Sequence, residues 1–250
     1  IECPRDAMQG WKNFIPTEKK VEYLNALLKV GFDVLDFGSF VSPKAIPQMA
    51  DTKEIIPQLQ LSDTKLLAII ANTRGAEEAS VYDEISYLGF PFSVSETFQR
   101  KNTNSTIEES FVRVREIQDI CVRKGKVLVI YISMAFGNPY NDPWSEEIVK
   151  KWVTDIASLG IDTISLADTV GLATPEQVES LVSYLIITLR GTQFGVHLHS
   201  TPHNREAKIE AALNSSCGRF DGALKGIGGC PMANDELVGN IDTEWMISYF

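Results

Sequence analysis

Long apolar runs, paired cysteines and a surplus of basic residues are all missing from this 250-residue sequence. No stretch approaches the roughly 20 apolar residues that a membrane-spanning helix needs, and no secretory signal pattern is visible. The four cysteines form no CxxC pair, and in a chain of this length they do not indicate a disulfide framework. We therefore expect a protein of a reducing compartment, the cytoplasm, that has no membrane as a partner.

Acidic residues outnumber basic ones. Lys and Arg total 23, Asp and Glu total 33, and the formal net charge is −10. This balance disfavours a large nucleic-acid footprint or a polybasic membrane-binding surface. Hydrophobic residues make up 44% and aromatic residues 9%, which are ordinary values for globular proteins. We therefore expect neither a disordered nor a fibrous protein, and no nucleic acid as a partner.

Short apolar runs alternate with longer amphipathic stretches along the chain. The runs predict strands at residues 1–3, 33–36, 66–70, 88–94, 127–133, 163–166, 195–199 and 220–224. The amphipathic stretches predict helices at residues 17–30, 51–58, 77–82, 106–124, 145–159, 175–189 and 203–214. Eight strands that alternate with helices predict an α/β fold, the (β/α)8 TIM barrel, with a doubly wound open sheet as the competing fold.

The ends of the chain and the absence of linkers bear on its domain organisation. No linker, internal repeat or low-complexity segment interrupts the alternating pattern, so we expect one catalytic domain over residues 1–250. The sequence starts at Ile1 without a methionine, and residues 245–250 read as the middle of a helix. We therefore expect that both ends are trimmed relative to the natural protein.

All three histidines of the chain lie within one seven-residue window, at His197, His199 and His203. Residues 195–199 are predicted to form a strand, and side chains two positions apart on a strand point to the same side. His197 and His199 therefore share a face, which is a common way to hold a divalent metal. The alternative interpretation is a pair of hydrogen-bonded polar residues at a strand end.

Other polar side chains follow predicted strands, at the barrel end where active sites of this fold are built. They are Arg5, Asp6, Asp36, Ser39, Asn72, Glu96 and Asp168. Buried carboxylates are costly unless a cation or a metal compensates them, so their convergence indicates a functional site. Singly, each has a structural alternative: Asp168 as a helix cap, and Arg5 with Asp6 as a salt bridge under the barrel rim.

A glycine-rich loop, with Cys230 between Gly229 and Pro231, follows the last predicted strand. Glycine permits close approach of the backbone and mobility. A thiol near a metal and an arginine can act as a proton donor or acceptor. The alternative for a lone cysteine is a small inert hydrophobic residue, and this is the interpretation that we give to Cys3.

Together these motifs resemble hydroxymethylglutaryl-CoA lyases, a group of metal-dependent lyases built on a (β/α)8 barrel. The pieces that carry the resemblance are PRDAMQ at residues 4–9, SFVSPK at 39–44, ISLADTVG at 164–171, HLH at 197–199, GGCP at 228–231 and GN at 239–240. Their order and spacing make the signal specific, and the resemblance runs over nearly the whole chain.

The resemblance implies a set of roles for residues of this chain. The metal ligands would be Asp6, His197, His199 and Asn240, with Mg2+ or Mn2+ as the ion and Zn2+ as a chemical alternative. The catalytic residues would be Arg5, Asp6, Asp36 and Cys230, and the substrate contacts Arg5, Gln9, Lys12, Asn72 and Asp168. The substrate would be an acyl-CoA, and we expect a homodimer.

The implied reaction is the retro-Claisen cleavage of 3-hydroxy-3-methylglutaryl-CoA to acetyl-CoA and acetoacetate, a step of leucine catabolism. Several positions depart from the family pattern, among them Asp36, which replaces a glutamate, Asn138, which replaces a cysteine, and Ser200, which replaces an aspartate. A related Claisen-type synthase or aldolase of the same metal-barrel group, similar to isopropylmalate or homocitrate synthase, therefore stays open. A non-catalytic binding barrel is the third alternative, and the retained metal and thiol residues count against it.

Overall fold

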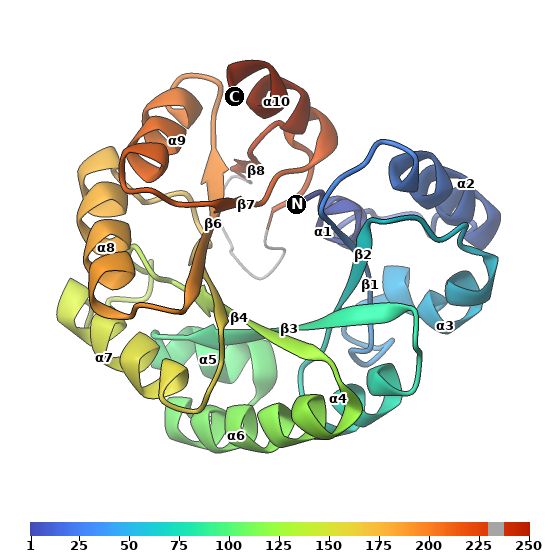
Figure 1. The fold of residues 1–250 in the computed structure, drawn as a ribbon, viewed down its shortest axis with the longest axis horizontal. Helices are drawn as coiled ribbons and strands as arrows, with labels where there is room; N and C mark the ends of the chain where they lie inside the picture. Colours follow the sequence, from blue (N-terminus) through green and yellow to red (C-terminus); the bar gives the residue numbers. More distant parts are fainter. Residues whose placement is uncertain (230–237) are drawn as a thin grey trace.

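The computed structural model describes residues 1–229 and 238–250, and it contains a curled parallel sheet surrounded by helices (Figure 1). Strands β1 to β7 lie side by side in the order of the sequence. They are Val34–Ser39, Lys65–Ile69, Ile85–Ser93, Val127–Ser133, Thr163–Asp168, Gln193–Ser200 and Arg219–Phe220. Each consecutive pair of these strands is parallel. The predicted (β/α)8 barrel is confirmed.

A single residue, Glu2, joins the first and the last strand of this sheet. It forms parallel bridges to Leu35 in β1 and to Gly222 just after β7. The Glu2 amide donates to the Val34 carbonyl at 3.1 Å, and the Cys3 amide donates to the Gly222 carbonyl at 2.9 Å. The strand predicted at residues 1–3 is thus reduced to one bridging residue, because Pro4 begins helix α1 and offers no N–H for a further ladder bond.

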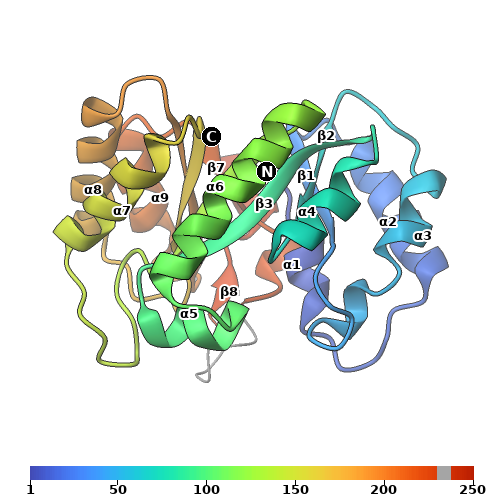
Figure 2. The ribbon, with the colours of Figure 1, turned by 90° about the horizontal axis from the view of Figure 1, so that it is seen from below.

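Helices alternate with the strands and cover the outside of the sheet (Figures 1 and 2). Helices α1 to α10 are Pro4–Gln9, Thr17–Leu28, Thr52–Ile55, Thr73–Ser80, Glu96–Thr103, Ile107–Lys124, Glu146–Ala157, Pro175–Thr188, Arg205–Asn214 and Thr243–Tyr249. Three 3-10 helices are Pro47–Met49, Ile56–Gln58 and Leu224–Gly226. None of the described helices combines the length and the apolar character that a membrane crossing requires. Helices α1 and α5 were not predicted, since each is too short to reveal a period.

The last predicted strand, at residues 220–224, differs most from the structure. Strand β7 ends at Phe220, and the 3-10 helix begins at Leu224. A further short strand, β8 at Gly239–Asn240, pairs antiparallel with β6 so that Asn240 lies opposite His199. Figure 2 shows β8 and α5 at the same end of the barrel, where the parallel strands finish.

The inside of the barrel is part apolar and part polar. Val34, Leu67, Ile69, Val129 and Tyr131, which belong to β1, β2 and β4, form an apolar cluster. On the other side, the pairing of Gly195 with Arg219 places an arginine inside the barrel. A Cβ atom at Gly195 would lie 2.8 Å from Cδ of Arg219, so glycine makes room for that side chain. The barrel therefore carries charged groups directly below the site described next.

Candidate active site

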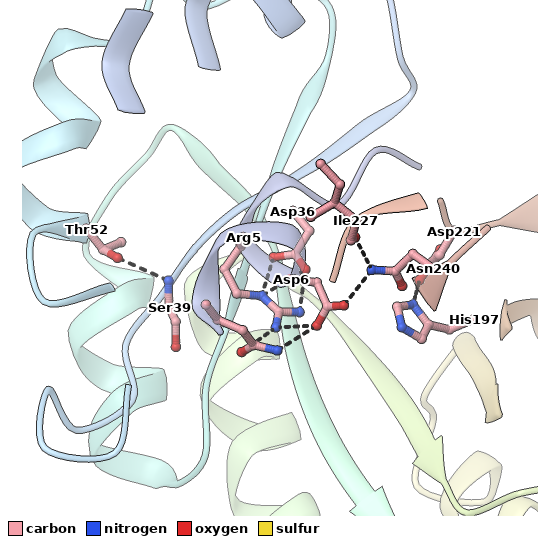
Figure 3. Close-up of polar contacts among 10 residues, drawn as sticks. Arg5, Asp6, Asp36, Ser39, Thr52, His197, Asp221, Ile227 and Asn240 are labelled. Atoms are coloured by element: carbon pink, nitrogen blue, oxygen red, sulfur yellow. Dashed lines mark hydrogen bonds and ion pairs between the residues drawn. The ribbon is translucent and has the colours of Figure 1, made fainter. Parts of the chain in front are cut away.

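Helix α1 turns across the barrel end and brings Arg5 and Asp6 to the strand termini (Figure 3). The Arg5 guanidinium is held by Asp36 from the first strand, with Nη2 2.5 Å and Nε 3.0 Å from Oδ2 of that residue. Its Nη1 donates to Oδ1 of Asp6 and to Oε1 of Gln9, both at 3.0 Å. A guanidinium has five N–H bonds, so these contacts leave one on Nη2 for another acceptor.

The two histidines of β6 lie on the same face, as predicted. Their ring centroids are 5.3 Å apart, and one ligand atom each from His197, His199 and Asp6 all lie within 4.8 Å of one another. His199 Nε2 is buried and has no hydrogen-bond partner in the described part of the chain. A buried imidazole nitrogen without a partner is costly, and a metal ion at this point would satisfy it.

The protonation states of His199 and Asp6 suit a cation. Burial and the neighbouring His197 lower the pKa of His199 to about 4, so its ring is neutral near pH 7 and carries a free lone pair. Burial raises the pKa of Asp6, but the Arg5 and histidine charges outweigh it and lower the pKa to about 2. The Asp6 carboxylate is therefore ionised, and the donor set fits a divalent metal.

Asn240 approaches the same point from β8. Its side-chain nitrogen donates to Oδ2 of Asp6 at 2.8 Å and to the Ile227 carbonyl at 2.9 Å (Figure 3). Both N–H bonds of the amide are thereby used, and the side-chain oxygen remains as the atom that can bind a metal. The structure thus brings together all four residues that the sequence analysis named as metal ligands.

A cavity of about 260 Å3 opens beside this cluster. Its polar side is formed by the site residues, among them Arg5, Asp6, Asp36, His197 and His199. The remaining wall is mostly apolar and comes from the strand ends, α5 and the loop after β1: Val41, Ala45, Ile46, Ile69, Ala71, Pro91 and Phe98. The arrangement can bind a molecule that has a polar head and an apolar body.

Some predicted site residues lie elsewhere. Asn72 is an exposed N-cap of α4, and its side chain accepts a hydrogen bond from the Gly75 amide. Lys12 is exposed on the loop after α1. Asp168 is buried, and its two oxygens accept from Lys208 Nζ at 2.7 Å and from the Ala173 amide at 3.1 Å. None of these three residues lines the cavity, so their substrate contacts stay predictions.

Cys230 lies outside the described residues. Gly228 belongs to the described residues, and it packs tightly against the site. A Cβ atom at Gly228 would lie 2.7 Å from Nδ2 of Asn240 and 2.9 Å from Cα of Ala7. Any side chain at position 228 would collide with α1 and Asn240, so the segment that leads to Cys230 depends on glycine here.

Two buried charged residues were missed by the sequence analysis. Asp221 Oδ2 lies 3.2 Å from His197 Nδ1, and Lys208 Nζ donates to the His199 carbonyl at 2.9 Å as well as to Asp168. Two signals were available in the sequence. One is an aspartate inside a predicted apolar strand, and the other is a lysine beside Ile209 on an alanine-containing helix. Asp221 contacts the ring of His197, and Lys208 contacts the backbone of β6 at His199.

Replacing Lys208 by methionine is expected to destabilise the protein strongly. The Lys208 and Asp168 side chains are each only 1% exposed, so the variant leaves a buried carboxylate without its cation. Loss of one partner of such a pair costs about 3–5 kcal/mol. Chemical denaturation would measure the change in the free energy of unfolding. The double variant Lys208→Met/Asp168→Asn should recover part of the loss, and a single variant as stable as the wild type would contradict the expectation.

Comparison with known sequences shows the family of this chain. A model of the HMGL-like family matches residues 3–249. The mitochondrial hydroxymethylglutaryl-CoA lyase of Mus musculus is 33% identical over 98% of this chain and 75% of its own length. The Bacillus subtilis lyase YngG is 32% identical over 96% and 80%. The mitochondrial lyase of Arabidopsis thaliana is 32% identical over 96% of this chain, which spans about half of that longer protein (51%).

Solved structures give the same result. An HMG-CoA lyase from Acinetobacter baumannii, in complex with coenzyme A and 3-methylmalate, superposes with a TM-score of 0.93 at 34% identity, over 99% of this chain and 81% of that one. The HMG-CoA lyase of Bacillus subtilis has a TM-score of 0.92 at 30% identity, over 99% and 83%. Because the family model matches residues 3–249 of this chain, the chain belongs to the HMGL-like family.

Proposed function

We propose that this protein is a metal-dependent lyase that cleaves 3-hydroxy-3-methylglutaryl-CoA to acetyl-CoA and acetoacetate. The observation that carries the proposal is the group of Asp6, His197 and His199, with its unpartnered His199 nitrogen, beside Arg5 in one cavity. The relatives named as HMG-CoA lyases cover nearly the whole chain, and one neighbouring structure holds coenzyme A, which supports an acyl-CoA as the substrate.

The residues that would hold the cation are Asp6, His197, His199 and Asn240. Their mixture of carboxylate, amide and imidazole donors favours Mg2+ or Mn2+, and Zn2+ is a chemical alternative. When bound, a divalent cation lowers the pKa of a coordinated hydroxyl group and orients the substrate. Asp6 is held for this task by Gln9 Nε2 at 2.7 Å and by Asn240, so its oxygens have a defined direction before an ion arrives.

Cleavage converts the tertiary alcohol of the substrate to a ketone. A carboxylate that lines the cavity accepts the hydroxyl proton, the carbon–carbon bond breaks, and its electron pair moves into the thioester as an enolate. We assign stabilisation of this enolate oxygen to Arg5, which keeps one N–H on Nη2 after its contacts with Asp36, Asp6 and Gln9. Because Asp36 holds the guanidinium in a buried position, little reorganisation is needed when negative charge develops.

Asp36 is the residue that we propose to make the reaction depend on pH. Burial raises the pKa of its carboxyl group to about 6, against the opposing effect of Arg5. Below this pH the carboxylate gains a proton and loses its ion pair with Arg5, so kcat/KM should fall as the pH drops through about 6. Profiles of kcat/KM against pH would test this. The variant Asp36→Asn should lose that acid limb, and an unchanged limb would reject the assignment.

Cys230 is proposed to protonate the enolate carbon, which becomes the methyl group of acetyl-CoA. The variant Cys230→Ala is then expected to lower kcat by about 10^2- to 10^4-fold, as for other general acids, with a much smaller change in KM. Steady-state kinetics with the assigned substrate would measure both constants. Cys121→Ala is the matched control, since this buried thiol lies on α6. A Cys230→Ala variant with wild-type kcat would exclude the role.

The function itself is tested by mixing purified protein and Mg2+ or Mn2+ with 3-hydroxy-3-methylglutaryl-CoA, and measuring the release of acetyl-CoA and acetoacetate. Cleavage that stops in excess chelator supports the proposal. The synthase alternative predicts the reverse behaviour, in which acetyl-CoA is consumed only when a 2-oxo acid is present. A panel of related acyl-CoA esters would identify the substrate if the lyase activity lies with a close analogue.

A further inference from the structure

Asp221 lies next to the ring of the predicted metal ligand His197. It follows β7, its side chain is completely buried, and its Oδ2 is 3.2 Å from Nδ1 of His197 (Figure 3). No other hydrogen bond to a side-chain nitrogen of His197 is recorded within residues 1–229 and 238–250. A buried carboxylate at this place therefore has the histidine as its direct partner.

This contact assigns different tasks to the two nitrogens of the His197 ring. With Nδ1 facing Asp221, only Nε2 remains to point toward Asp6 and His199, the residues with which His197 could hold an ion. A carboxylate accepts hydrogen bonds and cannot donate one when it is ionised. Nδ1 must then carry the proton, and the lone pair that a metal needs lies on Nε2.

Arg219 supports Asp221 as an anion. The arginine side chain is 5% exposed and lies inside the barrel, next to Gly195 of β6. Its positive charge and the Asp221 carboxylate attract each other. Nε and Nη2 of Arg219 and Oδ1 of Asp221 have no hydrogen-bond partner among the described residues. The positive charges of Arg219 and of the N-terminus thus favour the ionised form of Asp221.

We infer that Asp221 is a positioning residue, which fixes the tautomer and the orientation of His197 so that Nε2 faces the ion site. The inference rests on the proposed metal-dependent function, because it concerns how that site is held. Asp221 would act through His197 and would touch neither the ion nor the substrate. His199 is held differently, by the backbone of Thr169, so a change at Asp221 should affect one of the two histidines.

The test compares Asp221→Asn with the wild type in two measurements. In metal-free protein, 15N chemical shifts of the His197 ring report which nitrogen carries the proton, and we expect the variant to lose the uniform Nδ1–H form. Mn2+ binding, followed by electron paramagnetic resonance of the free ion, should weaken by about 10- to 100-fold, as for other residues that orient metal ligands.

Asp51→Asn is the matched control for this experiment. Asp51 is also a buried carboxylate, but its cation is Lys20 of α2, at 2.7 Å. We expect this variant to lose stability while it keeps the wild-type Mn2+ affinity and His197 shifts. If Asp221→Asn fails to fold, the wild-type spectrum at a pH where the His197 ring is neutral is decisive, since a proton on Nε2 and none on Nδ1 would overturn the inference.

The competing arrangement is a metal bound by Asp221 itself. Cys3, His197 and Asp221 also offer ligand atoms that lie within 4.8 Å of one another. Cd2+ bound there would give a thiolate charge-transfer band that Cys3→Ser removes, and such a band would overturn the positioning role. Wild-type Mn2+ affinity in Asp221→Asn would do the same. A wild-type protein that binds no Mn2+ but keeps an Nδ1 proton lost in Asp221→Asn would reject the proposed metal function and leave the positioning role supported.

Discussion

Replacing Arg5 by glutamine is expected to lower kcat by about 10^2- to 10^3-fold, the usual cost of removing a donor that stabilises a developing oxyanion. Among the described residues that line the cavity, Arg5 is the one cation apart from the histidines. Its contacts with Asp36 and Asp6 hold the guanidinium in place before substrate binds. The interaction lost in the variant is the one with the enolate oxygen, whose charge develops only in the transition state. Saturation kinetics would therefore show a decrease in kcat that exceeds any rise in KM.

Two further variants make the Arg5 experiment specific. Arg5→Lys keeps the charge but cannot reproduce the two-nitrogen contact with Asp36, so most of the loss should persist. Arg100→Gln removes an arginine from an exposed ion pair with Glu96 on α5, and should keep the wild-type kcat. An Arg5→Gln enzyme that retains most of its turnover would remove Arg5 from the chemistry.

Replacing His199 by alanine is expected to abolish both metal binding and turnover. This histidine is 3% exposed, and its Nε2 has no partner in the part of the chain that the structure describes. Burial and the neighbouring His197 lower its pKa to about 4, so its lone pair is free to bind a metal near pH 7. Without it, Asp6 and His197 keep an incomplete donor set. Titration calorimetry with Mn2+ and the cleavage assay would measure the two losses.

The third histidine supplies the control. His203 is exposed in the turn after β6, and His203→Ala should bind Mn2+ and turn over substrate as the wild type does. His199→Gln preserves most of the side-chain volume, which separates loss of the ligand from loss of packing. Ligand binding to the folded state raises Tm, so both His199 variants should lose the Mn2+-induced rise while they still unfold cooperatively. A normal rise in either variant would contradict the assignment.

The fold was largely predictable, because hydrophobic period is a local property. The strands predicted at residues 127–133 and 163–166 and the helix at 106–124 lie within a few residues of β4, β5 and α6. The predictions were wrong for segments that are too short to show a hydrophobic period. The predicted strand at residues 1–3 is reduced to the two bridges of Glu2, and the predicted last strand at 220–224 is divided between β7, isolated bridges and a 3-10 helix. Such short segments are defined by their neighbours in space.

Asp6, His197 and His199 were identified from the sequence because strand alternation and strand ends are readable from local order, and the family motifs added Asn240. The structure decided how they meet. Asn240 reaches Asp6 across 234 positions of sequence through β8, and α1 turns Arg5 onto Asp36. The roles of Asp221 and Lys208 could be recognised only in the folded structure, because the effect of a buried charge depends on the partners that folding places beside it. Local pattern thus determined which groups can do chemistry, and the closed barrel, which alone sets distances between remote residues, determined what each of them faces.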